Sequence, residues 1–147
     1  MVQNNISASN NTLIELHVPD FEKAKAYYGQ LGFKVVWERR PEADKGYLVL
    51  KMDHNLLCFW PGTNAVYDQS YFKNFPKQTK RGYGVEIVIM IDNIENYYEK
   101  VKDLANMIEP LALKPWGLKD FRTTDPFGYY LRFTSYHDIL DNGNAVP

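Results

Sequence analysis

The residues best suited to chemistry near the start of the chain are Glu15 and His17, which are separated by a single residue. The surrounding stretch is expected to form a β-strand, so both side chains should lie on one face, while Ile14, Leu16 and Val18 pack under a helix on the other. A histidine beside a carboxylate can act as a general acid or base, or it can hydrogen-bond a ligand. A histidine that is hydrogen-bonded for structural reasons is more common, and this is the interpretation that we favour.

Aromatic side chains give a second chemical signal, because the chain contains 3 Trp, 11 Tyr and 8 Phe. Strand alternation predicts that Trp60 and Tyr130 share the face of Glu15, whereas Trp37 and Trp116 are expected near its rim, on a strand end and a loop. Flat aromatic surfaces with a few polar groups favour the binding of a planar molecule over a reaction centre. An aromatic-rich chain also places many such residues in its core whatever its function.

Several other functions are not indicated. The sequence has no nucleophile elbow, phosphate-binding loop or dinucleotide-binding fingerprint, so no cofactor is expected. Its single cysteine, Cys58, cannot form an internal disulfide and is interpreted as an inert filler. With 17 Lys and Arg against 18 Asp and Glu, the net charge is −1, which favours neither nucleic acid nor a membrane as a partner. The first residues do not resemble an export signal, so we expect a cytoplasmic protein.

The elements that position these residues are suggested by an internal repeat. The segments LIELHVPDFEKAKAYY, from residue 13, and EIVIMIDNIENYYEKV, from residue 86, align without a gap. In each segment an apolar stretch meets an Asp or Asn, Asp20 or Asn93, and apolar residues then recur at helical spacing. The sequence therefore predicts a strand followed by a capped helix in each copy.

Three further strands are predicted after each helix, at 34–38, 46–52 and 56–60 and then from about 108, 121 and 129. The predicted fold class is α+β, with two tandem β-α-β-β-β modules at 13–60 and 83–135. The crossover at 61–82 carries Tyr67, Tyr71, Phe72 and Phe75, so we expect it to be ordered and to cover apolar surface. Its cations, Lys73, Lys77, Lys80 and Arg81, are expected to be solvated, and residues 1–12 and 136–147 to be flexible.

Three segments carry a family resemblance: VPDFEKAKAYYGQLGF, IDNIENYY and PWGLKDFRTTDPFGYYLRF. Across residues 12–135 the chain resembles the vicinal oxygen chelate superfamily, which comprises glyoxalases, bleomycin-resistance proteins and extradiol dioxygenases. The last segment is similar to that of the bleomycin-resistance branch. The resemblance implies that the modules form a concave, cup-shaped mixed sheet with the helices outside. The DPFG sequence within it also predicts a hairpin turn before the last strand.

Metal-dependent members of this superfamily hold the ion with four residues, and the resemblance places Leu13, Cys58, Glu86 and Arg132 at those positions. One carboxylate, one thiol, one alkyl group and one permanent cation do not suit a divalent ion, so no metal is expected. Because Glu86 and Arg132 would occupy adjacent ligand positions, we expect them to form a salt bridge.

The resemblance implies a metal-independent protein that binds and sequesters a bulky, partly planar molecule such as bleomycin, that serves antibiotic resistance, and that forms a homodimer. The expected ligand-binding residues are Glu15, His17, Trp37, Trp60, Glu86, Trp116, Tyr130 and Arg132. The nearly neutral chain weakens the case for a cationic drug. Two alternatives remain open: a glyoxalase-like or dioxygenase-like metalloenzyme with a relocated site built from Glu15, His17 and Glu86, or a dimer with a vestigial cup.

Overall fold

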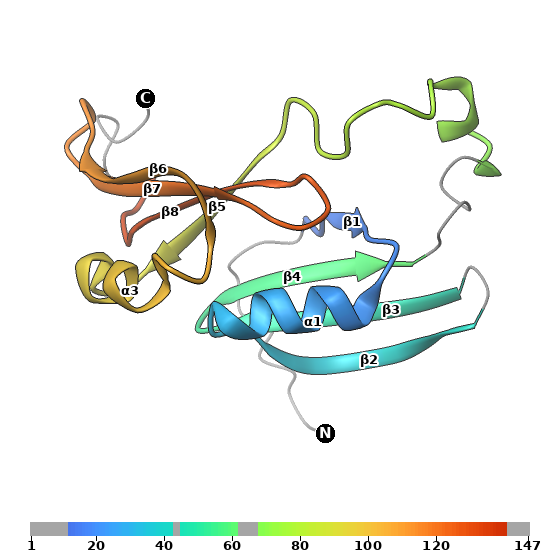
Figure 1. The fold of residues 1–147 in the computed structure, drawn as a ribbon, viewed down its shortest axis with the longest axis horizontal. Coiled ribbons are helices and arrows are strands. Elements are labelled where there is room, and N and C mark those ends of the chain that lie inside the picture. Colours follow the sequence, from blue (N-terminus) through green and yellow to red (C-terminus); the bar gives the residue numbers. More distant parts are fainter. Residues whose placement is uncertain (1–11, 43–44, 62–67, 141–147) are drawn as a thin grey trace.

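The computed structural model describes residues 12–42, 45–61 and 68–140, and it confirms an α+β fold of two tandem modules (Figure 1). Each module forms one four-stranded mixed sheet, with strand orders β1-β4-β3-β2 and β5-β8-β7-β6. We call them sheet A and sheet B. The first module contains β1 (Glu15–His17), α1 (Phe21–Gln30), β2 (Lys34–Glu42), β3 (Lys45–Met52) and β4 (Asn55–Trp60). The second contains β5 (Glu86–Ile91), α3 (Ile94–Val101), β6 (Asn106–Leu113), β7 (Lys119–Thr124) and β8 (Tyr130–Ser135).

Both helices begin where the repeat predicts. The carboxylate of Asp20 accepts a hydrogen bond from the backbone N–H of Lys23 at 3.0 Å, and the side chain of Asn93 accepts one from Asn96 at 3.2 Å. These side chains satisfy backbone donors that have no partner inside the helix. In each module the first strand then pairs in parallel with the last, because the helix carries the chain across the sheet.

The predicted hairpin turn is present between β7 and β8. One carboxylate oxygen of Asp125, Oδ1, accepts hydrogen bonds from the backbone N–H groups of Phe127 at 2.9 Å and Tyr129 at 2.8 Å. Gly128 has a φ of 102°, which residues with a side chain rarely adopt. The local sequence is therefore sufficient to explain this turn.

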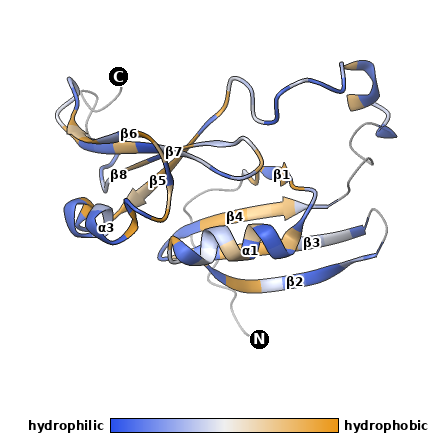
Figure 2. Cartoon of the chain, viewed as in Figure 1, coloured by the Kyte–Doolittle hydropathy of each residue, from blue (hydrophilic) through white to orange (hydrophobic). Residues whose placement is uncertain are grey.

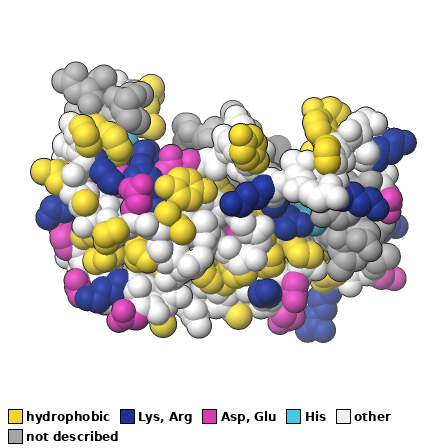
Figure 3. Space-filling view, turned by 45° about the horizontal axis from the view of Figure 1, so that its top comes forward, with side chains coloured by type: hydrophobic (Ala, Val, Ile, Leu, Met, Phe, Trp, Pro, Cys, Tyr) yellow, Lys and Arg dark blue, Asp and Glu magenta, His cyan; other side chains and the backbone are white. Residues whose placement is uncertain are grey.

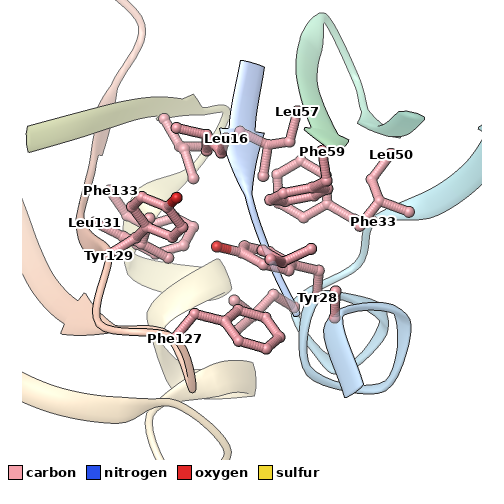
Figure 4. Close-up of a cluster of buried hydrophobic side chains, with 14 of the residues drawn as sticks. Leu16, Tyr28, Phe33, Leu50, Leu57, Phe59, Phe127, Tyr129, Leu131 and Phe133 are labelled. Atoms are coloured by element: carbon pink, nitrogen blue, oxygen red, sulfur yellow. The ribbon is translucent and has the colours of Figure 1, made fainter. Parts of the chain in front are cut away.

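One hydrophobic core joins the two modules. The apolar residues that recur at helical spacing, Phe21, Ala24 and Tyr28 on α1 and Leu31 at its C-cap, are buried, and α1 shows both hydrophobic and hydrophilic residues in Figure 2. Figure 4 shows side chains of both modules around Tyr28, with Phe59 on one side and Leu131 on the other. Burying such apolar surface is the main favourable term in folding.

Hydrogen bonds across the core fix the two modules against each other. The Tyr28 hydroxyl donates to Asp125 Oδ2 at 2.6 Å, and the Tyr97 hydroxyl donates to the backbone carbonyl of Leu31 at 2.7 Å. The side-chain amide of Asn55 donates to the carbonyl of Met90 at 3.0 Å. These long side chains bring polar partners into a buried region where an unpaired group would be costly.

Some details differ from the sequence predictions. Ile14 was expected under a helix, but it is 68% exposed because the first strand begins only at Glu15. Strand β2 extends to Glu42, four residues beyond the predicted end. In the crossover, Tyr71, Phe72 and Phe75 are themselves exposed rather than buried.

The predicted ends are only partly described. Residues 1–11, residues 141–147 and Tyr67 lie outside the described part of the chain. None of the helices in the described part is long and apolar enough to cross a membrane.

Candidate functional site

A pocket lies between the end of sheet A, the crossover and the start of the second module. It has a volume of about 540 Å³, and we call it the crossover pocket. Its walls are mainly aromatic and apolar, with Trp60, Tyr71 and Phe72 among the lining residues. In the space-filling view hydrophobic side chains project from the upper side of the molecule, with Lys and Arg side chains beside them (Figure 3). A concave aromatic surface with few polar groups is typical of a small-molecule site.

Strand pairing positions one wall of this pocket. His17 of β1 lies opposite Trp60 of β4 in parallel register, and their ring centroids are 4.6 Å apart. Trp60 also stacks with Phe72 of the short 3₁₀ helix η1 (Phe72–Asn74), with centroids 6.3 Å apart and planes inclined by 20°. The exposed crossover aromatics therefore form the outer wall of a pocket whose inner wall is sheet A.

Arg81 connects the two walls. Its Nε donates a hydrogen bond to His17 Nδ1 at 3.2 Å, and its Nη1 donates to the carbonyl of Phe127 at 3.2 Å. Because Nδ1 must offer its lone pair to Arg81, the His17 ring is neutral, with its proton on Nε2. The Tyr129 hydroxyl also donates to the backbone carbonyl of His17 at 2.7 Å. His17 is thus a buried, hydrogen-bonded strand histidine, as the favoured interpretation holds, and it lines the crossover pocket.

The prediction that Arg81 is simply a solvated loop cation is wrong. The side chain is half-buried and is held by atoms 64 and 46 positions away along the chain. Gly82 beside it has a φ of 73°, and a Cβ there would lie 2.6 Å from the Tyr129 ring. Because Gly82 has no side chain, the backbone can pass close to the Tyr129 ring, and this close approach positions Arg81. The Arg-Gly pair in the sequence is the only local signal of this arrangement.

A second group of predicted residues lies on sheet B. Glu86 Oε1 is 3.9 Å from Arg132 Nε, which agrees with the expected ion pair. The sequence analysis missed the stronger partner, since Arg122 Nε donates to the same oxygen at 3.0 Å. Arg122 lies opposite Arg132 in the β7–β8 register, so strand alternation could have placed it on this face.

Arg122 is the centre of a larger charged cluster. Its Nη1 also donates to Glu109 at 3.0 Å and to Asp120 at 3.2 Å, and Lys114 donates to Glu109 at 2.8 Å. Burial raises the pKa of the fully buried Asp120 carboxyl, whereas Arg122 and Lys114 act in the opposite direction. Three cations and three carboxylates balance here, so the cluster is self-compensating.

Trp116 covers this cluster from one side. The centre of its ring lies 5.8 Å from the Arg132 guanidinium carbon and 6.0 Å from that of Arg122, distances that suit cation–π attraction. Arg132 Nε is buried and makes no hydrogen bond within the described residues. Trp116 therefore stabilises arginines on sheet B rather than lining the crossover pocket.

On sheet A, Cys58 is buried and Trp37 is 54% exposed. The Tyr47 ring lies 5.8 Å from that of Trp37. The pKa of Tyr47 is raised by burial first, and then by hydrogen bonding to Cys58 and Glu15. The burial of Cys58 is what a filler role in the core requires.

The predicted ligand-binding residues thus divide into three groups. Glu15, His17 and Trp60 line the crossover pocket. Glu86 and Tyr130 line a smaller pocket of about 320 Å³, which shares the wall formed by residues 80–83 and Val85. The third group, which lines neither of these two pockets, consists of Trp37, Trp116 and Arg132.

The residues at the four family metal positions do not fit a divalent ion. Leu13 has no donor atom, Cys58 is buried against Tyr47, and Glu86 is paired with two arginines, one of which, Arg132, fills a ligand position. Within the described ranges no three His, Cys, Asp or Glu side chains are grouped to hold a metal ion. The relocated set of Glu15, His17 and Glu86 does not form such a group among the residues that the structure describes.

Comparisons with known proteins agree with this architecture. The family model described as Glyoxalase/Bleomycin resistance protein/Dioxygenase superfamily matches residues 12–133. A bleomycin-binding protein solved in complex with bleomycin has a TM-score of 0.58 at 19% identity, covering 88% of this chain and all of that one. A bleomycin resistance determinant encoded on the transposon Tn5 has a TM-score of 0.56 at 20% identity, covering 86% of this chain and 99% of that one.

A glyoxalase family protein from Enterococcus faecalis has a TM-score of 0.60 at 22% identity, covering 87% of this chain and 98% of the other. A comparison with curated proteins gave no match. At such identities, likeness to solved structures shows a shared fold, and function has to be argued from the site.

Proposed function

This chain belongs to the Glyoxalase/Bleomycin resistance protein/Dioxygenase superfamily, and we propose that it binds and sequesters a bulky, partly planar small molecule in the crossover pocket, without metal and without turnover. The single observation that carries the proposal is the aromatic wall of that pocket. Trp60 contacts the rings of both His17 and Phe72, and all three residues line the pocket that a planar ligand would enter. Its volume of about 540 Å³ lies within the range of known ligand sites.

The proposal of binding without turnover is supported by the chemistry of the site. Two side chains on the inner wall, His17 and Glu15, have the usual chemistry of a general base. His17 Nδ1 accepts a hydrogen bond from Arg81, and Glu15 lies close enough to Tyr47 to raise the pKa of its hydroxyl. The carboxylates of sheet B are paired with arginine and lysine. Such compensated groups hold structure and leave little free basicity for proton transfer.

A cytoplasmic homodimer and a role in antibiotic resistance remain part of the proposal. The dimer is supported by large apolar side chains on the face of sheet A opposite α1, where Trp37 and Leu56 are each more than half exposed. Exposed apolar patches are typical of interfaces, and symmetric dimers are the commonest oligomers. Light scattering over a range of protein concentrations measures the oligomeric state directly, and a mass that stays monomeric would contradict this part.

The binding proposal is tested by isolating the fluorescence of one tryptophan at a time. The double variant Trp37→Phe/Trp116→Phe retains only Trp60, and the matched variant Trp60→Phe retains the other two. Both are titrated with bleomycin and a panel of planar compounds, and the metal content is measured on the same samples.

We expect a saturable change in emission from the Trp60-only protein, little change from the Trp60→Phe protein, and less than stoichiometric metal in both. Equal responses of the two variants would place binding outside the crossover pocket. A stoichiometric divalent ion would favour the metalloenzyme alternative instead, and indifference to every compound would favour a vestigial cup.

A further inference from the structure

Arg81 is a partly buried cation whose described partners are all neutral. Its two hydrogen bonds go to a neutral imidazole nitrogen and a backbone carbonyl, and within the described residues no carboxylate forms an ion pair with it. The contrast with Arg122 is clear, because Arg122 binds three carboxylates. Removing a charge from water without a counter-ion is unfavourable, so the arrangement at Arg81 favours the arrival of an anion.

The geometry leaves part of the Arg81 guanidinium available. Nε and Nη1 have partners, whereas Nη2 makes no hydrogen bond within the described residues. Nη2 is also not among the buried polar atoms that lack a partner, so its N–H groups reach solvent. Because Arg81 is held in place by His17 and Phe127, these donors are pre-positioned, which reduces the entropy lost on binding.

The charged side chains that line the crossover pocket, Arg81 included, carry a net positive charge. Lys80 is exposed, and no described residue pairs with its ammonium group. Among the described residues of the lining Glu15 is the only carboxylate, and it lies close enough to Tyr47 to raise the pKa of its hydroxyl. Two cations against this one carboxylate make the pocket locally positive, although the whole chain carries a net charge of −1.

From these observations we propose that the ligand of the crossover pocket is a planar aromatic acid, whose carboxylate binds Arg81 and Lys80 while its ring packs against Trp60 and Phe72. The inference rests on the proposed binding function and names its ligand class. Arg81 Nη2 and the Lys80 ammonium group can each donate to a carboxylate oxygen, and the aromatic wall supplies the apolar contact. A cationic aromatic molecule meets the same wall but is repelled by the two cations.

The test compares three ligands that share one ring system and differ in charge. The anion 2-naphthoate, the neutral 2-naphthalenemethanol and the cation 2-naphthylmethylammonium are titrated into the full-length protein by calorimetry at low salt. We expect 2-naphthoate to bind at least tenfold more tightly than the alcohol, which corresponds to about 1.4 kcal/mol, and the ammonium compound to bind more weakly than the alcohol. Added NaCl should weaken binding of the anion and leave the alcohol unchanged.

Substitutions then assign the effect to individual residues. Lys80→Gln changes an exposed side chain with no structural hydrogen bond, so the variant should fold, and we expect about threefold weaker binding of 2-naphthoate with the alcohol unaffected. Arg81→Gln should cost the anion about tenfold, and Arg81→Lys should recover part of that loss. The matched control is Lys73→Gln, an exposed crossover lysine that does not line the pocket, and it should leave binding of all three compounds unchanged.

The outcomes separate this inference from the proposed function. If the alcohol or the ammonium compound binds as tightly as 2-naphthoate, the ligand class is wrong while the binding function stands. Equal losses for Lys73→Gln and Lys80→Gln would likewise overturn it, because the effect would then come from general surface charge. If none of the three compounds binds, the inference fails, while the proposed function is decided separately by the tryptophan titration with bleomycin and the planar panel.

Discussion

Tyr27 and Tyr28 are neighbours on α1, and both reach the hairpin that joins β7 and β8, but they bind acceptors of different charge. The Tyr28 hydroxyl donates to the buried carboxylate of Asp125 at 2.6 Å, whereas the Tyr27 hydroxyl donates to the backbone carbonyl of Thr124 at 3.1 Å. The pair Tyr28→Phe and Tyr27→Phe therefore removes one hydroxyl each from almost the same place. This comparison measures how strongly the charged acceptor holds the two modules together.

A hydrogen bond to a charged group is worth about 1.5–3 kcal/mol, and one between neutral groups about 0.5–1.5 kcal/mol. We therefore expect Tyr28→Phe to lower the free energy of unfolding by about 2 kcal/mol and Tyr27→Phe by about 1 kcal/mol. Urea unfolding followed by tryptophan fluorescence measures both values, and unchanged m-values would show that the two states remain comparable.

The pH dependence of the two losses should also differ. Burial raises the pKa of the Asp125 carboxyl above its ordinary value, and the Tyr28 hydroxyl opposes that rise. Without this hydroxyl the pKa of Asp125 in the folded protein rises further. A carboxyl with a raised folded pKa contributes stability that is present below its unfolded pKa, about 3.9, and is lost as the pH rises through the folded value.

The deficit of Tyr28→Phe should therefore be larger at pH 7.5 than at pH 4, while that of Tyr27→Phe should not change, since a backbone carbonyl does not titrate. Equal deficits at neutral pH, or a Tyr28→Phe deficit that grows towards acid, would show that Asp125 does not receive this hydrogen bond as a carboxylate.

Two further predictions concern the pocket wall and the cluster on sheet B. Gly82 and Gly84 both have positive φ, so either alanine substitution should lower the free energy of unfolding by about 1 kcal/mol through backbone strain. Gly82→Ala should cost more and should also weaken ligand binding, because its Cβ would meet the Tyr129 ring. Identical urea midpoints for the two variants would refute this. Arg122→Met removes the common partner of three carboxylates and should cost about 2–3 kcal/mol, whereas Lys102→Met, which breaks an exposed pair with Glu99, should change the urea midpoint little. The Arg122 prediction is wrong if the two midpoints shift equally.

Features that depend on near neighbours in sequence were predicted well. The caps at Asp20 and Asn93 and the turn at Asp125 involve atoms within four residues of one another, so residue type and spacing are enough to specify them. Hydrophobic periodicity likewise identified the buried stripe of α1. The module repeat follows from these same local patterns.

The candidate site was predicted only in part, because strand alternation gives a face but not a position on it. Trp37 and Trp60 share a face of sheet A, yet only Trp60 lies at the end where the crossover forms a wall. Glu86 was correctly placed near Arg132, but Arg122 entered the pair through a strand register that had not been worked out. Trp116, which was expected near a ligand, lies over two arginines and lines neither of the two pockets, so its contact with a ligand stays a prediction.

The sequence by itself determined the two modules with their helix caps and turns. It also determined that the chain is rich in aromatic residues and that the residues at the family metal positions do not suit a divalent ion. Each of these features depends on residue identity and short-range spacing. Only the tertiary structure decided which of these residues share a pocket. Arg81 shows the reason: its partners His17 and Phe127 are distant in sequence, and they meet only when the two modules pack around one core.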